Sequence, residues 1–90
     1  MVFVTLCKVR SGTSKERTAR RLDYQYPEGM RVLGEWWLQT PDPEVILVTE
    51  ADSAAPMLAA RAAWDDVFDI TILPAVTAEE GMAIARQAMA

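Results

Sequence analysis

Two adjacent tryptophans, Trp36 and Trp37, constrain the fold more than any other feature of the chain. They lie in the segment 33–39, LGEWWLQ, whose composition is typical of a β-strand. Successive side chains of a strand point to opposite faces of the sheet, so if one ring enters the core, the other faces away from it. A tryptophan can bury about 150–250 Å² of surface. A sheet that contains this strand therefore needs an apolar cover on both faces.

Hydrophobic patterning and turn residues predict seven elements in residues 1–90. Strands are expected at 2–9, 31–39, 45–49 and 68–73. Capping boxes at Thr13 and Thr77 predict the starts of the first and third helices, and Asp52 or Ser53 is expected to cap the second. The short break at 41–43 favours a hairpin. This order predicts one α+β domain of ferredoxin-like βαββαβ plan, with a four-stranded antiparallel sheet and an extra C-terminal helix.

The two faces of this sheet differ in polarity. In three strands one face is wholly apolar, and we assign that face to the helices: it holds Val2, Val4 and Leu6 with Trp36, and Gly34 would let a helix approach. The opposite face is mixed. Because a face in contact with water should be polar, its apolar side chains need a cover. We expect a second copy of the chain to supply it in a homodimer.

Polar groups on the mixed face stand among apolar neighbours, a pattern typical of small-molecule sites. The predicted ligand-binding residues are Thr5, Cys7, Glu35, Trp37 and Thr71. Trp37 would stack on a small apolar or aromatic ligand, and Glu35 or Thr71 would orient it. The alternative is that these groups form hydrogen bonds across the dimer interface or line its rim.

Two of these residues have a second possible role. Burial beside an indole could raise the pKa of Glu35 and make it an acid or base, although an edge-strand charge that discourages aggregation is the favoured interpretation. Cys7 is expected to be a small buried hydrophobic residue rather than a reactive thiol. With no histidine and one cysteine, zinc, copper and histidine-ligated haem are not expected. We predict no metal, no cofactor and no catalytic residue.

Charge and composition limit the partners. A net charge of -4 and a pI near 4.6 argue against nucleic-acid binding, which depends on neutralising phosphates. No apolar run reaches the roughly 18 residues of a membrane span. The single cysteine and the lack of a signal peptide indicate a cytoplasmic protein.

The segments LGEW at 33–36 and VILVTEADS at 45–53, after a strand and a helix, resemble the small bacterial domain-of-unknown-function family 3303. The resemblance implies a ferredoxin-like dimeric α/β barrel, a structural role for Trp36 and no established activity. Three functions follow as alternatives: a small-molecule-binding module, which we favour; a cofactor-independent enzyme of the monooxygenase or isomerase type; and a purely structural dimerisation domain. Enzymes of this barrel tend to use His or Asn beside Trp, and the chain contains neither.

Overall fold

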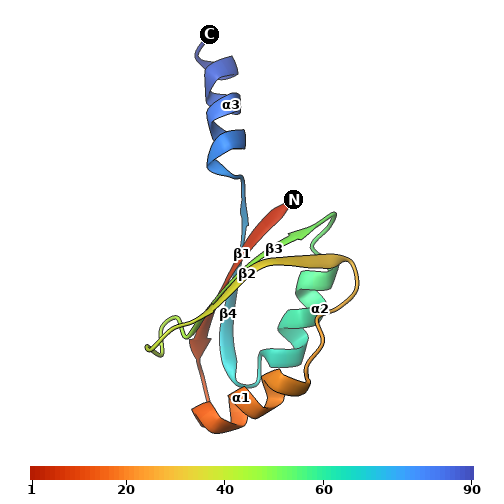
Figure 1. Cartoon of the computed structure of the whole chain (residues 1–90), viewed down its shortest axis with the longest axis vertical. Coiled ribbons are helices and arrows are strands. Elements are labelled where there is room, and N and C mark those ends of the chain that lie inside the picture. Colours follow the sequence, from red (N-terminus) through yellow and green to blue (C-terminus); the bar gives the residue numbers. More distant parts are fainter.

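Seven elements make up the fold in the computed structural model, which describes all of residues 1–90 (Figure 1). They are β1 (Val2–Val9), α1 (Ser14–Asp23), β2 (Met30–Trp37), β3 (Val45–Ala51), α2 (Ala55–Trp64), β4 (Phe68–Ala75) and α3 (Ala78–Ala88). The strands form one sheet in the order β2-β3-β1-β4, and every neighbouring pair is antiparallel. The predicted α+β ferredoxin-like plan with an additional C-terminal helix is confirmed.

Two of the three helices, α1 and α3, begin at the capping residues that the sequence predicted. The Thr13 hydroxyl oxygen accepts a hydrogen bond from the backbone N–H of Glu16 at 3.1 Å, and Thr77 does the same for Glu80 at 3.1 Å. Both predicted caps are confirmed. The N-cap position of α2 was predicted wrongly, since Ala54 occupies it and has no capping side chain, although the Ser53 hydroxyl oxygen accepts a hydrogen bond from the backbone N–H of Ala55 at 3.3 Å. Pro56 fixes the backbone of its first turn instead.

The helices cover the face of the sheet that carries Phe3, Thr5 and Cys7, all of them buried. Thr5 pairs with Leu47 of β3 and Ile72 of β4, so these side chains share the helix-covered face. Two small apolar clusters lie beneath α2: Phe3, Ala51 and Met57 in one, and Cys7, Trp64, Val67 and Phe68 in the other.

The assignment of Val2, Val4, Leu6 and Trp36 to the helices was therefore wrong. These residues lie on the opposite side, which no helix covers and which we call the open face. Its side chains are Val2, Val4, Leu6, Trp36, Ile46, Val48, Asp69, Thr71 and Leu73. Both faces are rich in apolar residues, so polarity alone could not tell which of them the helices cover.

A bulge in β2 separates its two ends. Val32 pairs with Thr49 on the helix-covered face, whereas Gly34 pairs with Val48 on the open face. Gly34 was predicted to let a helix approach the sheet, and this prediction was wrong. The Trp36 ring lies over it, and a Cβ atom at position 34 would come within 2.7 Å of Cζ3 of that ring. Glycine is required there because the indole lies flat against the strand.

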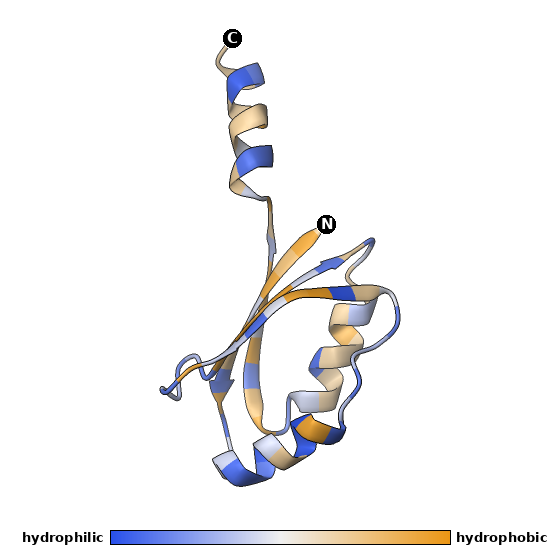
Figure 2. Cartoon of the chain, viewed as in Figure 1, coloured by the Kyte–Doolittle hydropathy of each residue, from blue (hydrophilic) through white to orange (hydrophobic).

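The last helix, α3, projects beyond the sheet (Figure 1). None of its side chains is buried, and polar and apolar turns alternate along it (Figure 2). The chain measures 52 × 28 × 17 Å, with a radius of gyration of 15.0 Å. A compact domain of this length would have about 12 Å. No helix of the chain is both long and apolar enough to cross a membrane.

Candidate functional site

A cavity of about 440 Å³ lies between the helix-covered face of the sheet and helices α1 and α2. Its floor comes from β1, β3 and β4, and α2 supplies one wall. The apolar part of the lining includes Val9, Val45, Leu47, Met57, Ala60, Trp64, Phe68, Ile70 and Ile72. Tyr26 and further residues of β1, α1, β2, α2 and the 38–44 loop complete the lining, among them the charged and polar ones.

The structure brings Thr5, Cys7, Glu35 and Trp37 together in this cavity, although they were predicted for a face covered by a second subunit. Thr71 is not among them. It pairs with Leu6 on the open face and is exposed, so its placement with the other four was wrong. The pleat explains this difference, because Ile70 and Ile72 on either side of Thr71 point into the cavity.

Glu35 is the centre of a hydrogen-bonded cluster on β2. Its carboxylate accepts two bonds from Arg21 at 3.0 and 2.9 Å, one from the Tyr26 hydroxyl at 2.7 Å and one from the Trp37 indole N–H at 2.7 Å. Burial raises the pKa of Glu35, but the bonds from Arg21, Trp37 and Tyr26 outweigh it and hold the pKa below its ordinary value.

The hypothesis that burial makes Glu35 an acid or base was therefore wrong. An ionised carboxylate with four donors around it has neither a proton to give nor a free lone pair to accept one. Its phenolic neighbour is equally poor in this role, since burial and then the Glu35 carboxylate raise the pKa of Tyr26.

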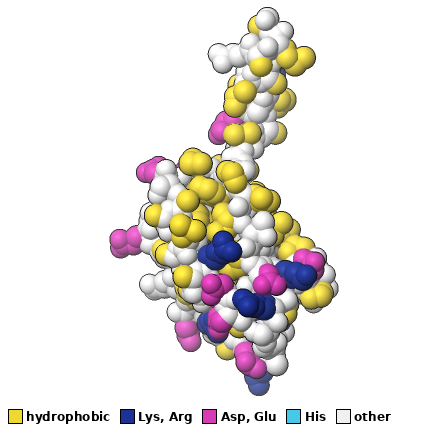
Figure 3. Space-filling view, turned by 180° about the vertical axis from the view of Figure 1, so that it is seen from behind, with side chains coloured by type: hydrophobic (Ala, Val, Ile, Leu, Met, Phe, Trp, Pro, Cys, Tyr) yellow, Lys and Arg dark blue, Asp and Glu magenta, His cyan; other side chains and the backbone are white.

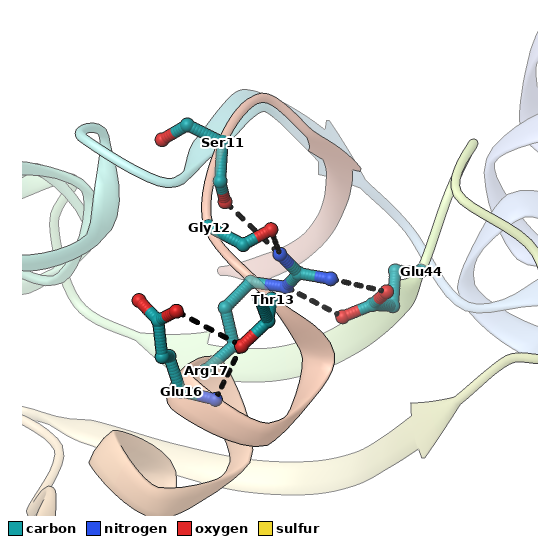
Figure 4. Close-up of polar contacts among 6 residues, drawn as sticks. All are labelled: Ser11, Gly12, Thr13, Glu16, Arg17 and Glu44. Atoms are coloured by element: carbon teal, nitrogen blue, oxygen red, sulfur yellow. Dashed lines mark hydrogen bonds and ion pairs between the residues drawn. The ribbon is translucent and has the colours of Figure 1, made fainter.

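A second ion pair closes the cavity where α1 meets the 38–44 loop (Figure 4). Arg17 donates to both carboxylate oxygens of Glu44, at 3.0 and 3.1 Å, and to the carbonyl oxygens of Ser11 and Gly12. Only 8% of the Arg17 side chain is exposed. Four of the five guanidinium N–H groups are thus bonded within the protein, and Arg17 holds the start of α1 in place.

Sequence reasoning missed the role of Arg17 and Arg21, because a run of basic residues on a helix was interpreted as a solvated face. The spacing of four residues between them could have indicated a shared role, since side chains at i and i+4 lie on one side of a helix. Arg20, between them, points elsewhere and pairs with Asp66 at 2.8 Å.

Two uncharged residues of β1 lie at the floor of the cavity. Burial, and then the carboxylates of Glu35 and Glu44, raise the pKa of the Cys7 thiol to about 11. Cys7 is free and buried, as predicted. Thr5 is 5% exposed, and its hydroxyl oxygen is the one buried side-chain polar atom without a hydrogen-bond partner.

The fold and the site together define a ferredoxin-like α+β domain with an apolar cavity whose rim is built from ion pairs. The family described as "Domain of unknown function (DUF3303)" matches residues 1–89, and the chain belongs to this family. No curated protein and no solved structure matches the chain.

Proposed function

We propose that the protein is a small-molecule-binding module and that the cavity beneath α1 and α2 is its binding site. The observation that carries this proposal is the cavity itself. Its volume of about 440 Å³ lies within the range of small-molecule sites, which are mostly apolar with a few placed polar groups. A closely packed interior would leave no such space, because protein cores are as dense as organic crystals.

The Thr5 hydroxyl supports the same proposal. A buried polar atom without a partner costs about 1–3 kcal/mol. Thr5 lines the cavity, and rotation about its Cα–Cβ bond would exchange the hydroxyl with the methyl group. A polar group on a bound molecule would then supply the missing hydrogen bond.

Binding is favoured over catalysis by the state of the reactive side chains. Glu35 is ionised and saturated with donors, and the raised pKa keeps Cys7 protonated at neutral pH. A nucleophile needs an adjacent base or a lowered pKa, and neither is present in the lining.

The proposal includes a homodimer in which a second copy covers the open face. The exposed hydrophobic residues include Trp36, at 53%, and Leu73, at 45%. Hydrophobic side chains gather where α3 leaves the body (Figure 3). The chain exposes 6191 Å², whereas a monomer of its mass would expose about 5,200 Å². A free, buried thiol suits a reducing compartment, so we place this dimer in the cytoplasm.

The three tryptophans provide the test of binding, because Trp37 and Trp64 line the cavity and Trp36 does not. The probe is N-phenyl-1-naphthylamine, a neutral apolar fluorophore, titrated into a Trp36→Phe variant. We expect saturable energy transfer from the remaining tryptophans to the probe. Ala60→Phe, which fills the cavity, should abolish saturation. Ala59→Phe makes the same change at an exposed position of α2 outside the lining and should leave it intact.

Absence of saturable probe binding to the folded Trp36→Phe protein would rule out the binding function. Equal binding by the Ala60→Phe and Ala59→Phe variants would also contradict it, because the probe would then lie elsewhere. The structural dimerisation domain would in either case become the better interpretation.

The dimer has its own test. Light scattering coupled to size exclusion should give about twice the 10.0 kDa of the chain. Trp36→Ala, on the open face, should shift the protein towards the monomer, whereas Trp37→Ala, on the other face, should not. A monomeric wild-type protein at micromolar concentration would exclude the dimer.

A further inference from the structure

We infer that the ligand is an apolar monoanion, a carboxylate with a hydrocarbon or aromatic tail, whose charged end lies at Arg61. This inference rests on the proposed binding function and adds the chemical class of the ligand. The tail would enter the cavity between the sheet and α2, and the carboxylate would remain at the rim.

The first argument is the balance of charges in the lining. Five charged side chains line the cavity, three of them positive and two negative: Arg17, Arg21, Arg61, Glu35 and Glu44. Arg17 pairs with Glu44 and Arg21 with Glu35, so these four cancel. Arg61 makes no ion pair, and its side chain makes no hydrogen bond to the protein. The cavity therefore has a net charge of +1, from three arginines and two glutamates, in a chain of net charge -4.

The second argument is the position of Arg61 on α2. The residues one turn before and after it, Met57 and Trp64, line the apolar wall of the cavity and are buried. Arg61 itself lines the cavity but is exposed. A guanidinium at the open end of an apolar wall suits a molecule with one apolar and one anionic end, because the planar fork matches a carboxylate.

Free hydrogen-bond donors line the same cavity. The hydroxyls of Ser14 and Thr18 on α1 and the side-chain amide of Gln39 make no hydrogen bond to the protein, and all three side chains are exposed.

A cationic ligand would meet an unpaired arginine, while the two glutamates that could attract it are already neutralised. The single unpaired positive charge matches one negative charge on the ligand.

The experiment compares decanoate with 1-decanol, two chains of equal length that differ in charge. Each competes with N-phenyl-1-naphthylamine for the wild-type protein at pH 7.5, below the critical micelle concentration. We expect the inhibition constant of decanoate to be lower than that of decanol by up to about fivefold, because Arg61 is exposed and water partly screens its charge. Arg61→Gln should remove this preference, so that decanoate and decanol compete about equally.

Arg86→Gln is the matched control, since it removes one positive charge from α3, away from the cavity. Circular dichroism would confirm that both variants are folded. Equal constants for decanoate and decanol in the wild-type protein would overturn the inference and leave the binding function standing. A decanoate preference that survives Arg61→Gln would overturn the assignment to Arg61. If the probe itself fails to bind, the proposed function fails first.

Discussion

At the level of single side chains, the polar residues around the cavity differ in how well they are paired. The ion-paired residues of the rim satisfy one another: Glu35 accepts four hydrogen bonds, and Arg17 donates four. Those at the floor, Thr5 and Cys7, have no such network. The rim therefore acts as a fixed frame, because each buried charge in it is held by several partners.

Cys7 should react slowly with alkylating reagents. Its pKa of about 11 lies about two units above the ordinary value of 9.0, so at pH 8 it holds about a hundredfold less thiolate than an ordinary cysteine. The rate of iodoacetamide labelling, followed by mass spectrometry, should be at least that much lower than in the urea-unfolded protein. Equal rates in the folded and unfolded states would contradict the burial of this thiol.

The Glu35 cluster should make stability depend on pH. The folded pKa of Glu35 lies below its ordinary value of 4.5, so the stability that the cluster contributes is fully present above about that pH. It is lost as the pH falls through the folded pKa. Urea unfolding between pH 6 and pH 3 should show a shallower decline for Glu35→Gln than for the wild type. Parallel declines would show that Glu35 does not contribute.

Four of the five predicted site residues line the cavity, but sequence reasoning found neither its location nor the rest of its lining. Alternation along a strand grouped Thr5 with Cys7 and Glu35 with Trp37, and each pair does lie on one face. It could not show how the faces of different strands align, because that depends on the register between them. For this reason Thr71 was placed with residues on the other side of the sheet. Ligand binding by these residues stays a prediction.

The elements themselves were more predictable than their faces. Strand composition, turn residues and the capping boxes at Thr13 and Thr77 are local signals, and the expected order of seven elements is confirmed. The bulge at Leu33 could not be predicted from local signals, because it is a shift in the register between β2 and β3. The Trp36 ring over Gly34 likewise depends on a packed arrangement that a pattern of residues does not encode.

The two confirmed caps should differ in their effect on stability. Thr13→Ala removes the cap of α1, which is tied to the body by Arg17, and should lower the free energy of unfolding by about 1 kcal/mol. Thr77→Ala removes the equivalent bond from α3, where no residue is buried. In the monomer, it should increase hydrogen exchange of the α3 amides and leave the urea midpoint unchanged. A lower midpoint for Thr77→Ala would mean that α3 stabilises the folded body.

At the scale of the whole molecule, the projecting α3 and the open face are two apolar surfaces that the chain itself leaves uncovered. Met82 and Ala85 of α3 recur at helical spacing with Met89 at its C-cap, and all three are exposed. We propose that in the dimer the α3 of one subunit also packs against its partner, which would add to the area that the open faces bury.

Substitutions on α3 should separate assembly from folding. Met82→Lys, on its apolar side, should raise the dimer dissociation constant about tenfold or more, since it removes a buried side chain and adds a charge. Gln87→Lys adds the same charge on another side of the helix and should have little effect. Sedimentation equilibrium measures both variants. Equal dissociation constants would place α3 outside the interface.

The way in which α1 is attached has a consequence for the cavity. Its only buried residue is Arg17, and Figure 2 shows a mostly hydrophilic helix. Ion pairs with Glu44, Glu35 and Asp66 tie it to the rest of the chain. Salt screens such pairs, the more exposed ones first, while apolar contacts are not weakened in this way. High ionic strength should therefore loosen α1 before any strand, and with it the roof of the cavity.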